Sequence, residues 1–109
     1  MATIEEFSRL EIRIGRVVLV ENIEKARKPM YKLTLDFGAE TGKKVIVAGI
    51  GSFYSKEELE GKQIACIVNL EPKTVAGVVS EGMILAADDG EGVAVLIPEK
   101  EMKEGSRIH

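Results

Sequence analysis

Residues 69–87 read N-L-E-P-K-T-V-A-G-V-V-S-E-G-M-I-L-A-A and connect two apolar runs that are typical of strands, 64–68 and 84–87. A proline and two glycines divide this connection, which indicates a long excursion rather than a tight hairpin. Its valines predict that parts of it fold back onto the protein, while its polar residues suit a binding surface on a rigid scaffold. Composition favours the alternative, a strand that crosses between two sheet layers.

The composition is that of one small domain. A chain of 109 residues has the length of a single domain, here 1–109, and folding buries about 65% of the surface that such a chain exposes when unfolded. With no Trp and 5% aromatic residues, aliphatic side chains must fill the core. The one cysteine, Cys66, excludes an internal disulfide and fits a reducing compartment. No apolar run approaches the roughly 20 residues of a membrane span, and the N-terminus lacks a secretion signal. We therefore expect a soluble, cytoplasmic protein without a membrane partner.

Short strands separated by turns follow one another along the chain. Thr3 and Glu6 have capping-box spacing and predict a helix over 3–9, in which Phe7 would seal one end of the core. Gly15, inside the first strand, predicts a bend or bulge. The remaining pattern predicts a short helix from Ser55 and strands over 10–20, 30–37, 43–48, 63–70, 83–87, 93–97 and 105–108. This order predicts an all-β protein, an OB-fold five-stranded Greek-key barrel with short helices and extra C-terminal strands. A plain β-sandwich is the alternative.

Charge is distributed unevenly along the chain. The net charge of −3 argues by itself against a nucleic-acid partner. The segment 25–44, however, carries six basic residues against two acidic ones and is locally +4. Its basic residues are Lys25, Arg27, Lys28, Lys32, Lys43 and Lys44. A patch of this kind attracts phosphate within a Debye length even on an acidic protein. The alternative is a solvated surface turn.

Catalytic chemistry has few candidates in this sequence. The only histidine, His109, is the last residue, so acid–base catalysis by a histidine pair is not expected. Cys66 lies among apolar residues without a basic neighbour, which favours a packed thiol over a nucleophile. We expect no cofactor and no metal site. The few aromatic residues disfavour base stacking on single strands and favour recognition of a folded RNA by its shape, through phosphates and 2′-hydroxyls.

Segments spread over residues 7–106 resemble one family in their order. They are Phe7, Arg13-Ile14-Gly15, Tyr31-Lys32-Leu33, Asp36-Phe37-Gly38, Val47-Ala48-Gly49-Ile50, Asn69-Leu70, Lys73 and Ser80-Glu81-Gly82-Met83. The chain resembles the tRNA-binding domain that occurs in methionyl-tRNA synthetases, in free-standing tRNA-binding proteins and in endothelial monocyte-activating polypeptide II. The last three segments are the most specific part of this resemblance. The chain departs from the family at 23–24, where Ile-Glu replaces a frequent His-Pro.

The resemblance implies an OB-fold module that binds tRNA without catalysis, by its shape, at the outer corner of the L. It also implies a homodimer and a role as the separate β subunit that assists a methionyl-tRNA synthetase catalytic chain. A CsaA-like dimeric chaperone, or another protein-interaction module, is the alternative. The RNA-binding positions carried over from the family and from the basic segment are Arg13, Arg27, Lys28, Lys32, Asn69, Lys73, Ser80, Glu81 and Met83.

Several of these positions also have a structural interpretation. Arg13 would pair with Glu11 or Glu81, Ser80 or Glu81 would cap the loop, and Met83 would lie in the core. Dimerisation has a further reason in the apolar residues of 93–97 and 74–79, since a monomer of this size has little core to cover them.

Overall fold

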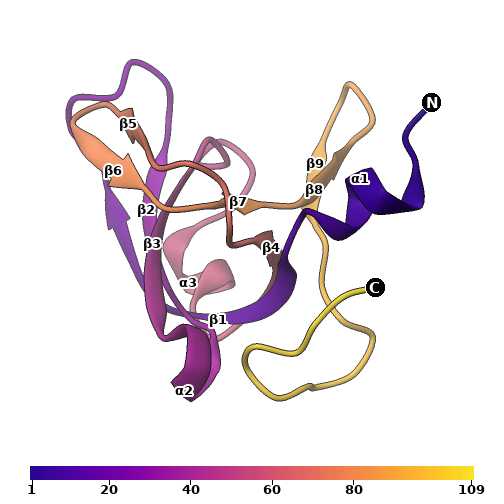
Figure 1. The fold of residues 1–109 in the computed structure, drawn as a ribbon. Coiled ribbons are helices and arrows are strands. Elements are labelled where there is room, and N and C mark those ends of the chain that lie inside the picture. The colour runs from indigo at the N-terminus through magenta and orange to yellow at the C-terminus, as the bar shows by residue number, and fades with distance from the viewer.

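The computed structural model describes residues 1–109 and forms a nearly closed antiparallel β-barrel (Figure 1). Its five-stranded sheet has the spatial order β3-β2-β1-β4-β7. The strands are β1 Ile12–Asn22, β2 Tyr31–Asp36, β3 Lys43–Ala48, β4 Gln63–Ile67 and β7 Met83–Ile84. The predicted OB-type barrel is confirmed, and a sandwich of two separate layers is not observed.

The core is built by the strict alternation of β2. Leu33 and Leu35 are fully buried, whereas Lys32 and Thr34 between them lie on the outer face. The helix α3, Lys56–Leu59, closes one end of the barrel with the buried side chain of its last residue. The largest fully buried side chains are Phe37, Leu33, Leu35, Ile46, Leu59, Ile64, Val17 and Cys66. Each aliphatic side chain of this size stabilises the fold by about 1.5–3 kcal/mol through burial.

The first strand bends because it pairs with both walls of the barrel. Residues 12–16 of β1 pair with β4, and residues 16–22 pair with β2. The predicted bulge is present, but the register shift lies between Val17 and Leu19 and not at Gly15. Glycine is needed at position 15 for a steric reason, since a Cβ atom there would lie 2.5 Å from Cε1 of Phe37. The glycine therefore makes room for the core phenylalanine, and the bend follows a few residues later.

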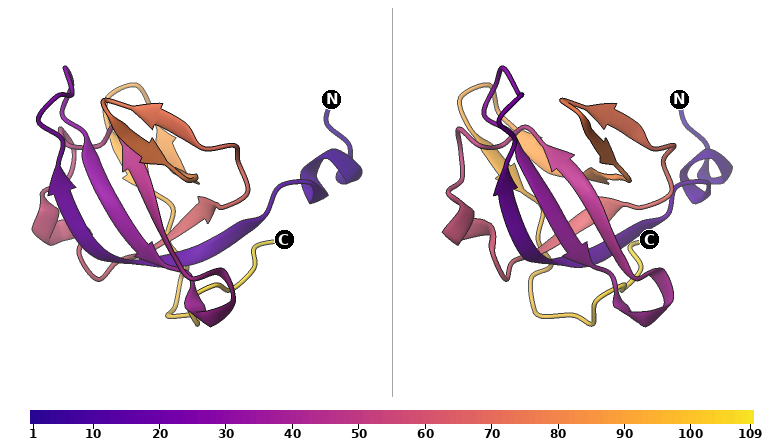
Figure 2. Two further views of the ribbon diagram at one scale, coloured as in Figure 1. Left: turned by 60° about the vertical axis from the view of Figure 1, so that its left-hand side comes forward. Right: turned by 90° about the vertical axis from the view of Figure 1, so that its left-hand side faces the viewer.

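The helix α1, Ile4–Ser8, has the predicted capping box but does not pack on the core. Thr3 Oγ1 accepts a hydrogen bond from Glu6 N at 3.1 Å, and Thr3 N donates to Glu6 Oε1 at 3.0 Å. No residue of α1 is buried, and Phe7 is 43% exposed, so the prediction that Phe7 seals the core is wrong. Figure 2 shows the helix standing away from the barrel. Capping satisfies the backbone of such a helix locally, and local spacing carries no information on where its apolar face points.

The long connection forms a hairpin in place of the crossing strand that composition favours. The hairpin consists of β5, Lys73–Val75, and β6, Val78–Ser80. Its two tip residues, Ala76 and Gly77, have φ angles of 50° and 84°. Positive φ at both central residues is the requirement of a two-residue type I′ turn. The excursion is therefore a short twisted ribbon, and it rises beside β3 (Figures 1 and 2).

Two further elements complete the second half of the chain. The predicted hairpin near the C-terminus is present as β8, Ala86–Asp88, and β9, Val93–Val95, and Val95 reaches the core. A single helical turn, α2 at Gly38–Thr41, occupies the place of the predicted turn between β2 and β3. The helices are short, and none of them has the length and apolar character that would let it cross a membrane.

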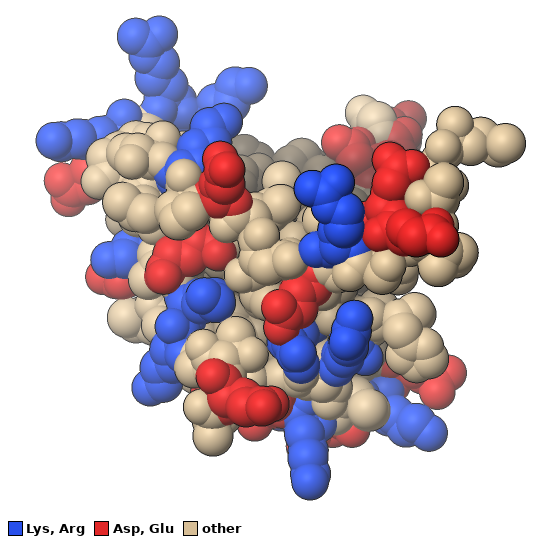
Figure 3. All heavy atoms as spheres, in the orientation of Figure 1, with Lys and Arg blue, Asp and Glu red and all other residues tan.

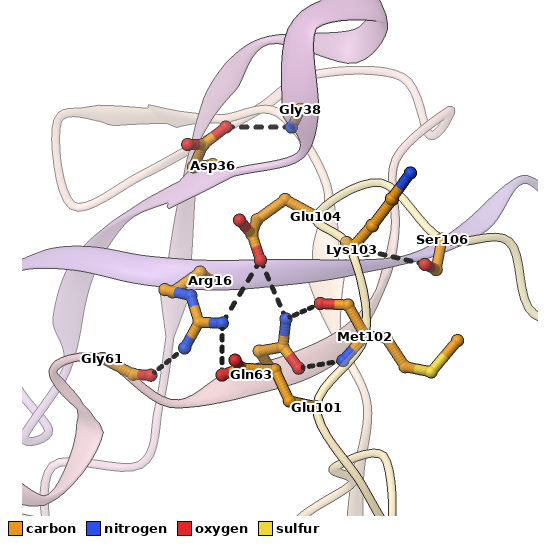
Figure 4. A network of polar contacts seen from close by, with 10 residues as sticks. All are labelled: Arg16, Asp36, Gly38, Gly61, Gln63, Glu101, Met102, Lys103, Glu104 and Ser106. Atoms are coloured by element: carbon orange, nitrogen blue, oxygen red, sulfur yellow. Dashed lines mark hydrogen bonds and ion pairs between the residues drawn. The ribbon is translucent and has the colours of Figure 1, made fainter.

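The C-terminal segment, residues 101–108, runs back along the outer edge of β1. Gly105 N donates to the Ile14 carbonyl at 2.7 Å, and Ile14 N donates to the Ser106 carbonyl at 2.9 Å. Figure 4 shows how side chains fix this segment: Arg16 binds both Glu101 and Glu104, while the Gln63 amide bonds both backbone groups of the Met102 residue. The predicted last strand is thus present as an edge pairing, with a single antiparallel bridge between residues 13 and 107.

Candidate nucleic-acid interface

Ser80 and Glu81 close the barrel against the free edge of β3. The Ser80 hydroxyl accepts from Val47 N at 3.0 Å and donates to the Gly82 carbonyl at 3.1 Å, and the residue is only 7% exposed. Glu81 N donates to the Val45 carbonyl at 2.8 Å, and its Oε1 accepts from Val45 N at 2.9 Å. These bonds replace the backbone ladder that a longer last strand would make. We call residues 80–82 the seam of the barrel.

The rest of the Ser-Glu-Gly-Met segment is explained by the same closure. A Cβ atom at Gly82 would lie 2.5 Å from the Ile67 carbonyl oxygen, so only glycine lets the chain pass β4 this closely. Met83 follows at the start of β7, opposite Ile67, and is 51% exposed. The alternative that placed Met83 in the core is therefore wrong, and its side chain is available to a partner.

A hollow lies between the outer face of β2–β3 and the β5–β6 hairpin. It has a volume of about 400 Å³ and combines a cation and an anion with an aliphatic surface. Its lining residues are Lys32, Val45, Pro72, Gly77, Val78, Val79 and Glu81. Lys32 forms one ion pair, with Glu21. Its Nζ lies 3.9 Å from Glu21 Oε1, which is too long for a hydrogen bond. The ammonium group thus remains free to meet a ligand.

Exposed basic side chains crowd the loop that joins β1 to β2. Lys25, Arg27 and Lys28 are all exposed there. In Figure 3 basic side chains project from this loop at the upper left. Lys43 and Lys44 lie elsewhere, because Lys43 pairs with Asp36 at the far end of the β2–β3 hairpin. Five residues of strand separate the two ends by roughly 17 Å. The prediction that 25–44 forms one basic patch is therefore wrong, since the fold divides it into two groups.

Of the remaining predicted positions, Asn69 and Arg13 make hydrogen bonds within the protein, whereas Lys73 does not form a salt bridge. Asn69 holds the segment behind α1: its Oδ1 accepts from Glu11 N at 2.7 Å, and its Nδ2 donates to the Arg9 carbonyl at 2.8 Å. Arg13 pairs with Glu11, with Nε 2.6 Å from Oε1, and donates to the carbonyl of residue 105. Lys73, by contrast, is exposed at the start of β5 and has no salt bridge.

The apolar residues of the hollow were not among the predicted RNA-binding positions. Val79 is 52% exposed at the hairpin, and Val45 and Val78 are half-buried beside it. The signal for Val45 was present in the sequence, since it alternates with the buried Ile46 and must lie on the outer face of its strand. The hairpin valines had no such signal, because their place depends on how the connection folds.

Comparison with known proteins identifies similar sequences and structures. Residues 12–107 match the model of the family described as putative tRNA binding domain. The methionine–tRNA ligase of Methanosarcina mazei is 48% identical over 105 residues, and that of Pyrococcus furiosus is 45% identical over 104 residues. Each alignment covers 95% of this chain but 14% of the relative, so the chain spans about one seventh of the length of these relatives.

Two solved structures are similar over their whole length. The CsaA chaperone protein from Picrophilus torridus has a TM-score of 0.94 and 38% identity, and the alignment covers 100% of both chains. The MetRS-related protein from Pyrococcus horikoshii has a TM-score of 0.90 and 34% identity, with 100% of this chain and 98% of that chain covered.

Proposed function

Because this chain belongs to the putative tRNA-binding domain family, we propose that it binds tRNA as a non-catalytic module through the outer face of β2 and β3. The arrangement of three features carries this proposal. The basic β1–β2 loop and the β5–β6 hairpin rise at the same end of the barrel (Figure 2), and the hollow with Lys32 lies between β2–β3 and that hairpin. In OB-type barrels this strand face and the loops beside it are the usual site for oligonucleotides.

Local charge accounts for binding by an acidic protein. The exposed cations of this end, at positions 25, 27, 28 and 73, act on phosphates within a Debye length, and the loop between β1 and β2 carries three cations against one acidic residue, Glu24. If four phosphates are engaged, the affinity for tRNA falls about 50- to 150-fold between 50 and 200 mM salt.

Filter binding with bulk tRNA at these two salt concentrations tests the proposal. Replacing Lys25, Arg27 and Lys28 together by Ala should weaken binding and flatten the salt dependence, for all tRNAs alike. The variant that replaces Lys43 and Lys44 by Ala serves as the control, because it removes cations from the other end of the hairpin. Equal losses in both variants, or binding that salt does not affect, would count against this interface.

We further propose that the module assists a methionyl-tRNA synthetase catalytic chain in the cytoplasm, as its separate β subunit. The support is the similarity to a part of methionine–tRNA ligases. Adding the protein to such a catalytic chain should lower the KM for tRNA without changing the KM for methionine. An unchanged KM for tRNA at saturating protein would contradict this role.

A homodimer is the assembly that we propose for the protein. An apolar groove of about 370 Å³ lies under the C-terminal segment, and α1 presents unburied apolar side chains of its own. The apolar groove residues are Ile14, Ala65, Leu85, Leu96, Ile97, Met102 and Ile108. Sedimentation at micromolar concentration should show a dimer that Ile97→Glu dissociates. Val18→Glu, at an exposed apolar position of β1 outside the groove, is the control and should remain dimeric.

A chaperone is the second candidate, favoured by the same apolar groove and by the similarity to CsaA. In this case the dimer binds an apolar peptide segment at this groove. Binding of an unfolded polypeptide by the dimer, which Ile97→Glu abolishes, would support the chaperone. If Ile97→Glu still binds tRNA, the two functions are separate, since the apolar groove and the hollow with Lys32 share no residue.

A further inference from the structure

We propose that Glu81 recognises the ribose of RNA, by accepting a hydrogen bond from a 2′-hydroxyl in the hollow; this inference rests on the proposed tRNA binding. The carboxylate has two oxygens with different surroundings. Oε1 is occupied by Val45 N at 2.9 Å. Oε2 makes no hydrogen bond within the protein, and it is not fully buried, because no fully buried side-chain oxygen or nitrogen lacks a partner. One acceptor is therefore fixed in place and free.

This acceptor and Lys32 line the same hollow from nearby positions of the barrel. Lys32 pairs with Val47 across the β2–β3 ladder, and the Glu81 carboxylate is bonded at Val45, two residues along the same strand. Two residues of strand span roughly 7 Å. A cation for a phosphate and an acceptor for a ribose hydroxyl thus line one hollow, attached to backbone positions that the barrel holds about 7 Å apart.

The lining of the hollow favours the sugar over the base. No aromatic side chain borders it, so a base finds no stacking platform there. Val45, Val78 and Val79 offer aliphatic surface for the ribose carbons instead. An ionised carboxylate can only accept hydrogen bonds, and a 2′-hydroxyl is the donor that distinguishes RNA from DNA. Glu81 therefore selects for a ribose hydroxyl and against sugars without one.

The sign of the effect separates this contact from general electrostatics. Removing a negative charge beside a polyanion should strengthen binding through Coulomb forces alone. If Glu81 accepts a hydrogen bond from RNA, Glu81→Gln weakens binding instead. The substitution keeps the geometry, because the amide oxygen of Gln still accepts from Val45 N. Its NH2 group can donate to the oxygen of a 2′-hydroxyl, but this bond is neutral and lacks the charge of the carboxylate.

The experiment is a four-way comparison of the full chain and its Glu81→Gln variant on two RNAs, by fluorescence anisotropy at one salt concentration. One RNA is a tRNA transcript, and the other has the same sequence with 2′-fluoro sugars, which lack the hydroxyl donor. The unmodified chain should bind the hydroxyl RNA about tenfold more tightly, the lower end of what a hydrogen bond to a charged group contributes. The variant should bind the hydroxyl RNA about fivefold more weakly, the difference between a charged and a neutral hydrogen bond, so its preference should fall to about twofold. Glu91→Gln, at the tip of the β8–β9 hairpin, should leave both affinities unchanged.

The outcomes distinguish failure of the Glu81 contact from failure of tRNA binding. A preference that keeps its full size in Glu81→Gln, or hydroxyl-RNA binding by that variant that is unchanged or tighter, overturns the inference. The unmodified chain alone decides the matter if the variant fails to fold, since equal affinity for the two RNAs also overturns it. Failure of the unmodified chain to bind either RNA contradicts the proposed function instead, and salt-dependent tRNA binding without sugar preference leaves that function standing.

Discussion

Removal of the Ser80 hydroxyl should destabilise the barrel without removing an RNA contact. The hydroxyl uses both its acceptor and its donor inside the protein, toward Val47 N and the Gly82 carbonyl. Ser80→Ala leaves these two half-buried backbone groups without partners. Each such group costs about 1–3 kcal/mol when sealed from water and less when water reaches it, so we expect a loss of about 2 kcal/mol in the free energy of unfolding.

A loss of this size is easily measured. For a domain of about 100 residues, 1 kcal/mol shifts the melting temperature by about 4 °C, so thermal unfolding followed by circular dichroism should move down by about 8 °C. Well below this transition, tRNA affinity of the variant should stay within about twofold of the unmodified protein. Ser52→Ala is the control, because Ser52 is exposed and makes no side-chain hydrogen bond. A Ser80→Ala variant that melts normally but loses tRNA would refute this account and make the hydroxyl an RNA contact.

Two other predictions concern the core and the C-terminal segment. Burial raises the pKa of Cys66 to about 12, so at pH 8 only about one thiol in ten thousand is ionised, and Ellman's reagent should react at the rate of unfolding, not of a free thiol. Fast labelling of the folded protein would contradict this burial. Gly105 has φ +89°, and a Cβ atom there would strike the Phe37 carbonyl oxygen, so Gly105→Ala should cost about 2–4 kcal/mol in urea unfolding. Gly90→Ala, with φ +88° but open space, should cost only about 1 kcal/mol, and similar losses in the two variants would refute the steric part.

The sequence predicted the elements that depend only on residues close to one another in the chain. Both capping boxes, at Thr3 and at Ser55, form as their spacing indicates. The alternation of β2 places its apolar side chains in the core, because a strand of period two has one buried face. These features need no knowledge of distant parts of the chain.

The parts that sequence reasoning missed depend on tertiary geometry. The tip of the β5–β6 hairpin is Ala-Gly, which lacks the Asn-Gly or Asp-Gly signal of a type I′ turn. The basic segment spans a whole hairpin, so residues close in sequence, such as Lys28 and Lys43, end up at opposite ends of it. The position of α1 was equally hidden, since its cap is satisfied whether or not Phe7 finds a core.

The seam links the stability of the barrel to its proposed ligand. Glu81 closes the barrel with one carboxylate oxygen and lines the hollow with the side chain that carries the other. A ligand that occupies the hollow therefore binds only the closed barrel, and it stabilises that state by about 2.7 kcal/mol at a concentration of 100 Kd. This exceeds the loss of about 2 kcal/mol expected from Ser80→Ala, so saturating tRNA should return the melting temperature of that variant to that of the unliganded, unmodified protein. If tRNA stabilises the unmodified protein but not Ser80→Ala, the Ser80 hydroxyl contacts the ligand directly and does not act only by closing the barrel.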